Sequence, residues 1–184
     1  FLHDNGLAGG RYNYNTMKLN SKCFMIIHPS NIDNLKSVIS VIKKYKYKHI
    51  VLGNGSNIIL PKYYDGIVIK LDKFNKMNFN DSIINVESGY MINKLASEIS
   101  SLGYTGLEWA TGIPGTIGGA IYSNAEAYKC PISDIVKDVT IYDGNSVKTL
   151  SNKDVKFEYR SSIFRHKKNL IILSCNIEVN KGDV

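Results

Sequence analysis

The chain has 184 residues, which is enough for one domain or two small ones with a hydrophobic core of their own. Its 43% hydrophobic and 21% charged residues are typical of a globular protein, and no apolar run approaches the roughly 18 residues of a membrane-spanning helix. The net charge of +7 would suit an anionic ligand, but the lysines are scattered and the densest run, residues 43–49, is typical of a solvated helix end, so we expect no nucleic-acid partner and no membrane partner.

The first half of the chain predicts a strand, a helix and a second strand. Residues 23–29 form an apolar run typical of a buried strand, and residues 30–46 carry apolar side chains at helical spacing. Ser30 is the predicted N-cap of that helix, with Asp33 in the position of a capping box. Residues 49–52 predict the next strand. This order is the usual mark of a parallel pair with a crossover helix.

The rest of the chain predicts strands with one further helix. Residues 67–71 and 82–88 are apolar runs typical of strands. A second amphipathic helix follows and ends at Gly103. A hairpin is expected over residues 134–151, because Asp143–Gly144 suits a turn, and residues 169–179 predict a last strand.

The cysteines and histidines show no ligand pattern. Cys23, Cys130 and Cys175 are odd in number and widely spaced, so we expect neither a zinc site nor a disulfide framework, and a reducing, cytoplasmic setting is the simplest interpretation. The histidines and carboxylates do not cluster at ligand spacing, so no metal site is expected. The histidines are predicted to be loop or surface residues: His3, His28, His49 and His166.

The stretch LGNGSN, residues 52–57, follows a predicted strand directly. Its glycines permit positive φ and close approach, and its Asn and Ser residues add short hydrogen-bonding groups. Such a loop can turn several N–H groups toward one phosphate. A tight turn that binds nothing is the alternative.

The stretch GIPGTIGGAIYSNAEAY, residues 112–128, follows neither a strand nor a helix pattern. Its glycines remove side chains where a ligand could lie against the main chain, Pro114 limits flexibility and Thr116 offers a hydroxyl. Neither a dinucleotide-binding GxGxxG at a helix start nor a GxxxxGK[ST] loop is present. Together the two glycine-rich loops predict a ligand with a diphosphate and a flat ring system, and flavin adenine dinucleotide (FAD) is the natural candidate.

Three segments resemble a known family. LGNGSN, GLEWATGIPGTIGGAIYSNAEAY and FEYRSSIF, in this order, are similar to the UDP-N-acetylenolpyruvoylglucosamine reductases, over residues 15–182. The resemblance implies an α+β, two-lobed FAD-binding domain of the vanillyl-alcohol-oxidase (PCMH-like) type with the flavin between the lobes. From the N-terminal composition and the order of the predicted elements, we expect a flexible leader over 1–14, a first lobe over 15–71 and a second lobe over 72–184.

The resemblance also implies site residues. Arg160 would be catalytic and would bind the substrate carboxylate together with Tyr159, since a guanidinium offers two parallel hydrogen bonds. In the family, NADPH reduces the FAD, which then reduces a UDP-sugar substrate in peptidoglycan synthesis. The cofactor-binding residues would be Gly53, Asn54, Gly55, Ser56, Asn57, Gly112, Ile113, Pro114, Gly115, Thr116, Gly118, Gly119, Ala120, Asn124 and Ala125.

The sequence departs from the family after Thr16, where Met17-Lys18 stands in place of the usual pair of glycines, and at two further places. Glu126 stands where the family usually has glycine, and a positive φ there would cost about 1–2 kcal/mol. The chain also stops where the family continues into a substrate-binding domain with a proton-donating serine and a late glutamate, so that domain is expected to be absent. A shortened chain, a split or decayed gene, and a second polypeptide that supplies the missing half are the three explanations.

Three functions remain open on the sequence. The first is an enzyme of this family, and the second is a non-catalytic or split-partner FAD-binding module. The third is another FAD oxidoreductase of the same fold, such as an alcohol oxidase, but no flavin-linking histidine or cysteine motif supports it.

Overall fold

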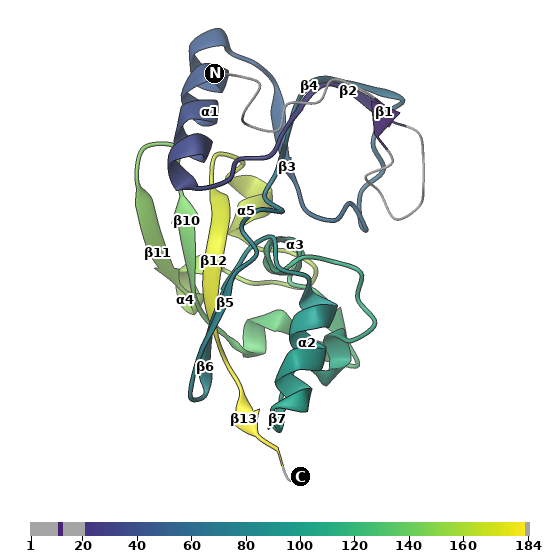
Figure 1. Ribbon diagram of the computed structural model, residues 1–184, viewed down its shortest axis with the longest axis vertical. Coiled ribbons are helices and arrows are strands. Elements are labelled where there is room, and N and C mark those ends of the chain that lie inside the picture. Colours follow the sequence, from purple (N-terminus) through teal and green to yellow (C-terminus); the bar gives the residue numbers. More distant parts are fainter. Residues whose placement is uncertain (1–10, 13–20, 183–184) are drawn as a thin grey trace. The chain divides into compact units, whose positions relative to one another are not determined.

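The computed structural model describes residues 11–12 and 21–182. The leader expected over 1–14 lies outside the described residues except for Arg11 and Tyr12. The chain divides into two compact units, residues 1–74 and residues 75–184, and each is described by itself. Figure 1 labels most of their helices and strands.

Unit 1 is built around a mainly parallel sheet with the strand order β1-β2-β4-β3. The central strand β4 pairs in parallel with β2 on one side and with β3 on the other, while β1 pairs antiparallel with β2. The last five residues of β4 are all buried, as is usual for a strand inside a parallel sheet. The predicted strands are confirmed, but β2 and β3 are not neighbours because β4 lies between them. The strands are β1 (Arg11–Tyr12), β2 (Ser21–Ile27), β3 (His49–Leu52) and β4 (Tyr63–Lys70).

The helix of unit 1, α1 (Ile32–Tyr45), connects β2 to β3 and buries Leu35, Ile39 and Ile42. The helix prediction is confirmed, but the predicted cap is wrong. Asn31, not Ser30, is the N-cap, and its side-chain oxygen accepts a hydrogen bond of 2.9 Å from the Asn34 N–H. An Asn oxygen is as good an N-cap acceptor as a Ser hydroxyl, so the pattern alone could not choose between adjacent candidates.

Unit 2 is built around an antiparallel sheet of five strands in the order β11-β10-β12-β6-β5. The predicted hairpin is confirmed as β10 and β11, with Gly144 at a φ of 89° in its turn. Unit 2 also has two separate short strand pairs: β7 (Tyr104–Thr105) with β13 (Asn180–Lys181), and β8 (Glu126–Ala127) with β9 (Cys130–Pro131). The main strands are β5 (Met77–Asn80), β6 (Ile83–Glu87), β10 (Val136–Tyr142), β11 (Val147–Ser151) and β12 (Ile171–Glu178).

The helices of unit 2 pack on one apolar core. The predicted helix is confirmed as α2 (Ile92–Ser101), and Gly103 follows it with a φ of 77°. Buried side chains of α2 and of the shorter α3 (Ile117–Ser123) join those of the sheet in that core. The remaining helical segments are α4 (Asn152–Val155), α5 (Ile163–His166) and the 3₁₀ turns η2 (Glu108–Ala110) and η3 (Ile132–Asp134). The combination of these elements is an α+β fold, as predicted.

Candidate functional site

The first glycine-rich loop, residues 53–57, begins where β3 ends. Because β2, β4 and β3 are parallel, their carboxyl ends lie at one edge of the sheet, with Leu52 of β3 opposite Lys70 of β4. In open sheets with parallel strands, ligands bind outside the carboxyl ends of the strands. Within the loop, Gly55 has a φ of 69°, a left-handed conformation that glycine adopts most readily. The loop therefore has the position and the backbone conformation of an anion-binding turn.

The buried side chain of Lys70 is hydrogen-bonded to this loop. Lys70 is the last residue of β4, only 7% of it is exposed, and its Nζ donates a hydrogen bond of 2.6 Å to the Gly53 carbonyl. Burial lowers the pKa of the Lys70 ammonium, and the charge of Asp72 acts in the opposite direction. Lys70 thus places a buried positive charge at the start of the loop. No sequence pattern indicates this role, because Lys70 is one polar residue at the end of an apolar strand.

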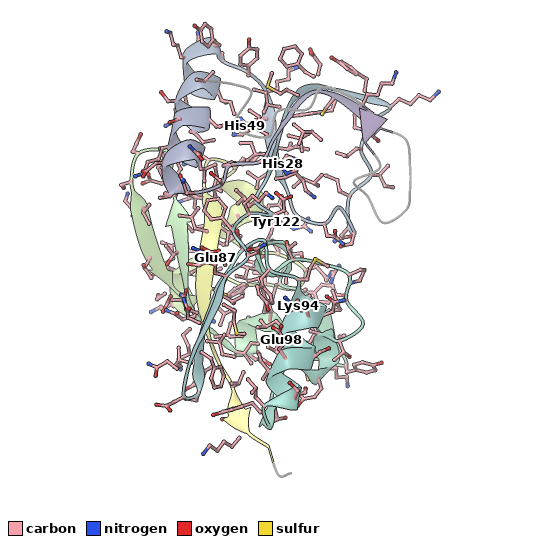
Figure 2. All side chains as sticks on the ribbon, viewed as in Figure 1. His28, His49, Glu87, Lys94, Glu98 and Tyr122 are labelled. Atoms are coloured by element: carbon pink, nitrogen blue, oxygen red, sulfur yellow. The ribbon has the colours of Figure 1, made fainter. Side chains whose placement is uncertain are left out.

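His28 lies at the same edge of the sheet, just after β2 (Figure 2). Its Nδ1 is 2.8 Å from Asp72 Oδ1 and 3.0 Å from Asp72 Oδ2. Asp72 follows β4, so this contact joins the segments after two neighbouring strands. The prediction of a loop residue is confirmed for His28, and its ring contacts the protein through this carboxylate.

The second glycine-rich stretch contains α3, which sequence patterning did not predict. The segment before α3 is fixed to the start of α2: the Ile92 N–H donates to the Gly115 carbonyl at 3.0 Å, and the Ile117 N–H donates to the Tyr90 carbonyl at 2.9 Å. Thr116 is the N-cap of α3 and accepts a hydrogen bond of 3.3 Å from the Gly119 N–H. Hydrogen bonds to a neighbouring segment, rather than helix propensity, therefore hold this stretch in shape.

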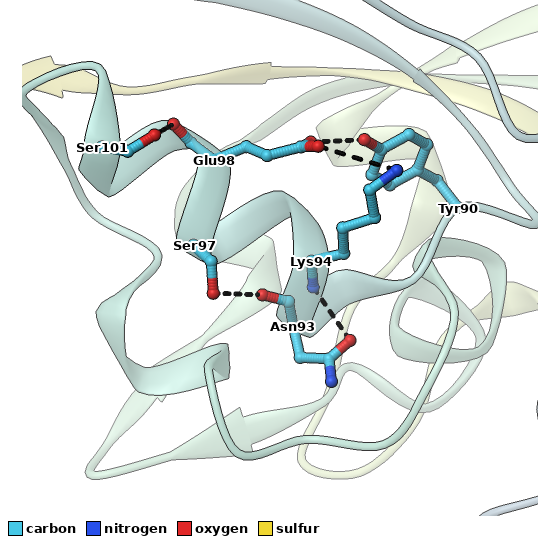
Figure 3. A network of polar contacts seen from close by, with 6 residues as sticks. All are labelled: Tyr90, Asn93, Lys94, Ser97, Glu98 and Ser101. Carbon is cyan, nitrogen blue, oxygen red and sulfur yellow. Dashed lines mark hydrogen bonds and ion pairs between the residues drawn. The ribbon is translucent and has the colours of Figure 1, made fainter.

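Tyr90 is itself anchored by the polar face of α2 (Figure 3). Its hydroxyl donates to Glu98 Oε2, and Lys94 Nζ lies 3.6 Å from Glu98 Oε1 and 5.0 Å from the centre of the Tyr90 ring. Burial and the neighbouring Glu98 both raise the pKa of the Tyr90 hydroxyl, so it stays protonated and remains a donor. Tyr90 thus links α2 to the glycine-rich stretch.

Two glycines of this stretch do different things. A Cβ at Gly118 would lie 2.9 Å from the Ser88 Cβ and 3.1 Å from the Ser88 carbonyl oxygen, so α3 can pack here only without a side chain. A Cβ at Gly112 would meet nothing within 4 Å, and Gly112 is exposed. Gly118 therefore serves packing, whereas Gly112 leaves bare main chain facing open space. The open space at the exposed Gly112 leaves room for a flat ligand, such as the flavin ring of the expected FAD.

The buried hydroxyl of Ser88 has no hydrogen-bond partner, which distinguishes it from the other buried side-chain polar atoms of the described residues. Ser88 follows β6, and its carbonyl accepts the Gly118 N–H at 2.8 Å. A buried hydroxyl left unpaired costs about 1–3 kcal/mol. The packing around Ser88 and Gly118 must therefore offset the free-energy cost of the unpaired Ser88 hydroxyl.

The segment FEYRSSIF forms a tight turn with Tyr159 and Arg160 at its tip. The Glu158 N–H donates to the Ser161 carbonyl and the Ser161 N–H donates to the Glu158 carbonyl, both at 3.1 Å. Arg160 has a φ of 54°, a left-handed conformation that is uncommon for a residue other than Gly, Asn or Asp. Both side chains at the tip are exposed. We call residues 158–161 the arginine turn.

Asn124 connects the arginine turn to α3. It is the C-cap of α3, only 6% exposed, and its Nδ2 donates to the Glu158 carbonyl at 3.0 Å while its Oδ1 accepts from the Ser133 N–H at 3.2 Å. Both ends of the amide are thus engaged within the protein. A direct contact of Asn124 with a cofactor, as predicted, stays a prediction.

The other predicted site residues differ in their exposure to solvent. In the second stretch Gly112, Pro114 and Gly119 are exposed, whereas Ala120 and Ala125 are buried in the core of unit 2. Glu126 lies in β8 and takes no positive φ, which falls instead at Tyr128 and Lys129. The expected strain at Glu126 is therefore avoided. In the described part of the chain, no group of three or more His, Cys, Asp or Glu residues could hold a metal ion.

None of the described helices has both the length and the apolar character of a membrane span. The three cysteines are free, with Cys175 buried and Cys130 exposed.

Comparison with known proteins agrees with this geometry. Residues 25–149, more than half of the chain, match the family of FAD binding domains. The UDP-N-acetylenolpyruvoylglucosamine reductase of Anoxybacillus flavithermus is 35% identical over 173 residues, which is 92% of this chain and 57% of that protein. The enzyme of the same name from Bacillus subtilis is 34% identical over 174 residues, 93% of this chain and 57% of the relative. The chain thus spans less than two thirds of the length of these relatives.

Solved structures share the fold. The UDP-N-acetylenolpyruvylglucosamine reductase of Thermus caldophilus superposes with a TM-score of 0.80 at 22% identity, covering 96% of this chain and 64% of that one. Cholesterol oxidase from Brevibacterium sterolicum superposes with a TM-score of 0.72 at 14% identity, covering 98% and 39%. These likenesses confirm the predicted fold class, and the relatives bear the name of the family that the three motifs resemble. The chain belongs to the family of FAD-binding domains.

Proposed function

We propose that the protein is the FAD-binding part of a reductase that uses NADPH to convert UDP-N-acetylenolpyruvoylglucosamine to UDP-N-acetylmuramate in peptidoglycan synthesis. The observation that supports this most is the identity of about 35% to reductases of this name over 92% of the chain. The free cysteines are consistent with work in a reducing cytoplasm. The substrate is then a small UDP-sugar.

The glycine-rich loops are the proposed cofactor ligands. Residues 53–57 would hold the diphosphate with main-chain N–H groups, aided by the buried charge of Lys70. Residues around Gly112, with open space before the main chain, would lie against the flavin. When bound, FAD supplies the hydride chemistry. The protein's part is to bind and orient it.

Arg160 is the proposed catalytic residue. Reduction of an enolpyruvyl double bond builds negative charge toward the neighbouring carboxylate, and a fixed guanidinium lowers the energy of that state more than that of the ground state. The exposed tip of the arginine turn leaves Arg160 and Tyr159 accessible to a substrate. The arginine would bind the carboxylate through two parallel hydrogen bonds.

Flavin binding and turnover test the proposal in one sample. The purified chain, reconstituted with FAD, should show flavin absorbance, and anaerobic NADPH should bleach it. Adding UDP-N-acetylenolpyruvoylglucosamine should then restore the oxidised spectrum, but only very slowly, because this chain spans 57% of the length of the relatives and is expected to be very weakly active by itself. A chain that takes up no FAD at micromolar concentration would contradict the proposal.

The alternative is a non-catalytic module, or one that works with a second polypeptide. Its supporting observation is that the chain covers only 57% of the relatives' length. It predicts FAD uptake without any substrate-dependent oxidation of NADPH by this chain alone. The same titration therefore separates the two functions.

A further inference from the structure

We propose that Asn124 is a positioning residue that sets the conformation of the arginine turn and thereby the place of Arg160. The inference assigns the buried amide to a carbonyl of the turn rather than to the cofactor. The role of Asn124 in catalysis rests on the proposed function, whereas its hydrogen bond to the Glu158 carbonyl does not.

The first support is the geometry of the amide. Asn124 has a φ of 44° and ends α3, with its N–H donating to main-chain carbonyls of the last turn of that helix. Its side chain is thereby directed away from the helix, where Nδ2 reaches the Glu158 carbonyl at 3.0 Å and Oδ1 receives the Ser133 N–H at 3.2 Å. With 6% of the residue exposed, little water can replace these bonds. One side chain therefore connects three separate segments.

The second support is that the arginine turn has an unfavourable backbone conformation, which needs stabilising contacts from other segments. The positive φ at Arg160 costs about 1–2 kcal/mol for a residue with a Cβ. Within the turn, two hydrogen bonds of 3.1 Å between Glu158 and Ser161 act against that cost. The Glu158 carbonyl is an acceptor in one of them and also accepts from Asn124. The amide thus acts on the very group that closes the turn.

A second bond secures the far side of the turn to the same helix. Ser162, which is 2% exposed, donates its hydroxyl to the Tyr122 carbonyl of α3 at 2.8 Å. Arg165 of α5 lies over the Tyr122 ring with 5.7 Å between the guanidinium carbon and the ring centre. Figure 2 labels Tyr122 on α3. The arginine turn is therefore fastened to α3 at Glu158, through Asn124, and just after its end at Ser162.

Hydrogen exchange of single amides tests the contact without cofactor or substrate. The variant Asn124→Asp keeps the oxygen that accepts from Ser133 and tolerates the left-handed conformation, but it loses the donor to Glu158. We expect the Glu158 and Ser161 N–H groups to exchange about tenfold faster, equivalent to about 1.4 kcal/mol. The Ala125 N–H, which donates to Ala120 in α3, should change less than about twofold.

A matched control removes a similar amide elsewhere. Asn85→Asp, on β6, deletes a donor to Asn176 Oδ1 at 2.9 Å and does not touch the arginine turn. It should leave the exchange of Glu158 and Ser161 unchanged. Unaltered exchange of those two amides in Asn124→Asp would overturn the inference. So would an equal acceleration at Ala125, because Asn124 would then merely cap α3.

A kinetic measurement tests whether Asn124 affects turnover through the arginine turn. In Asn124→Asp, turnover should fall about tenfold, whereas the dissociation constant for FAD should stay within about twofold of that of the unsubstituted chain. A loss of FAD affinity equal to the loss of turnover would assign Asn124 to the cofactor and overturn the inference. If the unsubstituted chain binds no FAD, the proposed function fails, while the exchange result still decides whether Asn124 holds the turn.

Discussion

At the scale of single residues, Gly112 and Gly118 belong to one motif but carry different constraints. Gly118 meets Ser88 so closely that a methyl group has no room, while Gly112 faces open space. Sequence patterning treats both as bare backbone. Only the packing partner separates a glycine required by the fold from a glycine that leaves room for a ligand.

We therefore expect opposite results from two alanine substitutions. Gly118→Ala should destabilise the protein by about 1–3 kcal/mol through overpacking against Ser88, even though alanine favours a helix. Gly112→Ala should change the free energy of unfolding by less than about 0.5 kcal/mol and weaken FAD binding. Urea denaturation and FAD titration of both variants check this. Equal loss of stability in the two would contradict the assignment.

Lys70 should affect the cofactor more than the fold. Lys70→Met removes a buried ammonium whose desolvation is unfavourable, so the free energy of unfolding should change by less than about 1 kcal/mol. The same change removes the bond to Gly53 and the charge near the proposed diphosphate site, so FAD affinity should fall about tenfold. Isothermal titration measures the affinity.

The control for Lys70 is Lys62→Met, because Lys62 is exposed and precedes β4 at the opposite end of the strand. It changes the net charge of the protein by the same amount. If both variants lose affinity equally, overall charge rather than the position of Lys70 explains the effect.

Arg160→Lys should separate cofactor binding from turnover. Lysine keeps the charge but cannot form two parallel hydrogen bonds to a carboxylate, so we expect turnover to fall about 10²–10³-fold with unchanged FAD content. Arg165→Lys, on α5, is the matched control and should retain turnover within a few-fold. Substrate-dependent NADPH oxidation is the measurement. Full activity of Arg160→Lys would show that turnover does not require the guanidinium of Arg160.

At the scale of elements, the beginning of α1 shows how a correct helix can carry a wrong cap. Asn31→Ala should cost about 1 kcal/mol of stability because the Asn34 N–H loses its acceptor. Ser30→Ala should cost only a few tenths of that, since the hydroxyl of the exposed Ser30 contacts the side chain of Asn34 and no main-chain N–H. Thermal unfolding of the two variants distinguishes them. A larger effect at Ser30 would reinstate it as the cap.

Elements with strong periodic patterns could be predicted from the sequence, and weakly patterned ones could not. The helices α1 and α2 place apolar residues on one face, and both were predicted. The helix α3 was missed because Gly118 and Gly119 have low helix propensity, and it depends on contacts with Ser88 and Tyr90 that are distant in the chain. Short elements such as α5 and β8 likewise owe their conformation to their neighbours.

The candidate site divides along the same line. The glycine-rich loops and Arg160 could be found because they form contiguous motifs. The roles of Lys70 and Asn124 could not, because each depends on one hydrogen bond to a carbonyl far away in the sequence, 17 and 34 positions respectively. Long-range pairing of this kind leaves no local pattern to read.

At the scale of the whole molecule, each unit has a core of its own. One cluster of buried residues, including Ile26, Leu52 and Val68, lies in unit 1, and a larger one lies in unit 2. Separate cores allow the units to open separately. That residues 15–71 and 72–184 are the two lobes of an FAD-binding domain stays a prediction.

A core substitution tests whether the units unfold separately. Leu35→Ala removes a fully buried side chain of α1 and should cost about 2–5 kcal/mol, raising the hydrogen exchange of β2 and β4 while leaving that of β10 and β12 nearly unchanged. Val41→Ala, at an exposed position of the same helix, is the control. Equal acceleration in both units would show that the chain unfolds as one cooperative body.

The position of β4 also has a consequence for synthesis of the protein on the ribosome. β2 and β3 are made before β4, which is the partner of β3 and the second partner of β2; until β4 is translated, β2 can pair only with the two-residue strand β1. Until residue 70 has left the exit tunnel, the nascent chain carries two apolar strands with unpaired edges. Such edges invite aggregation, so this segment is where a chaperone would be needed most during translation.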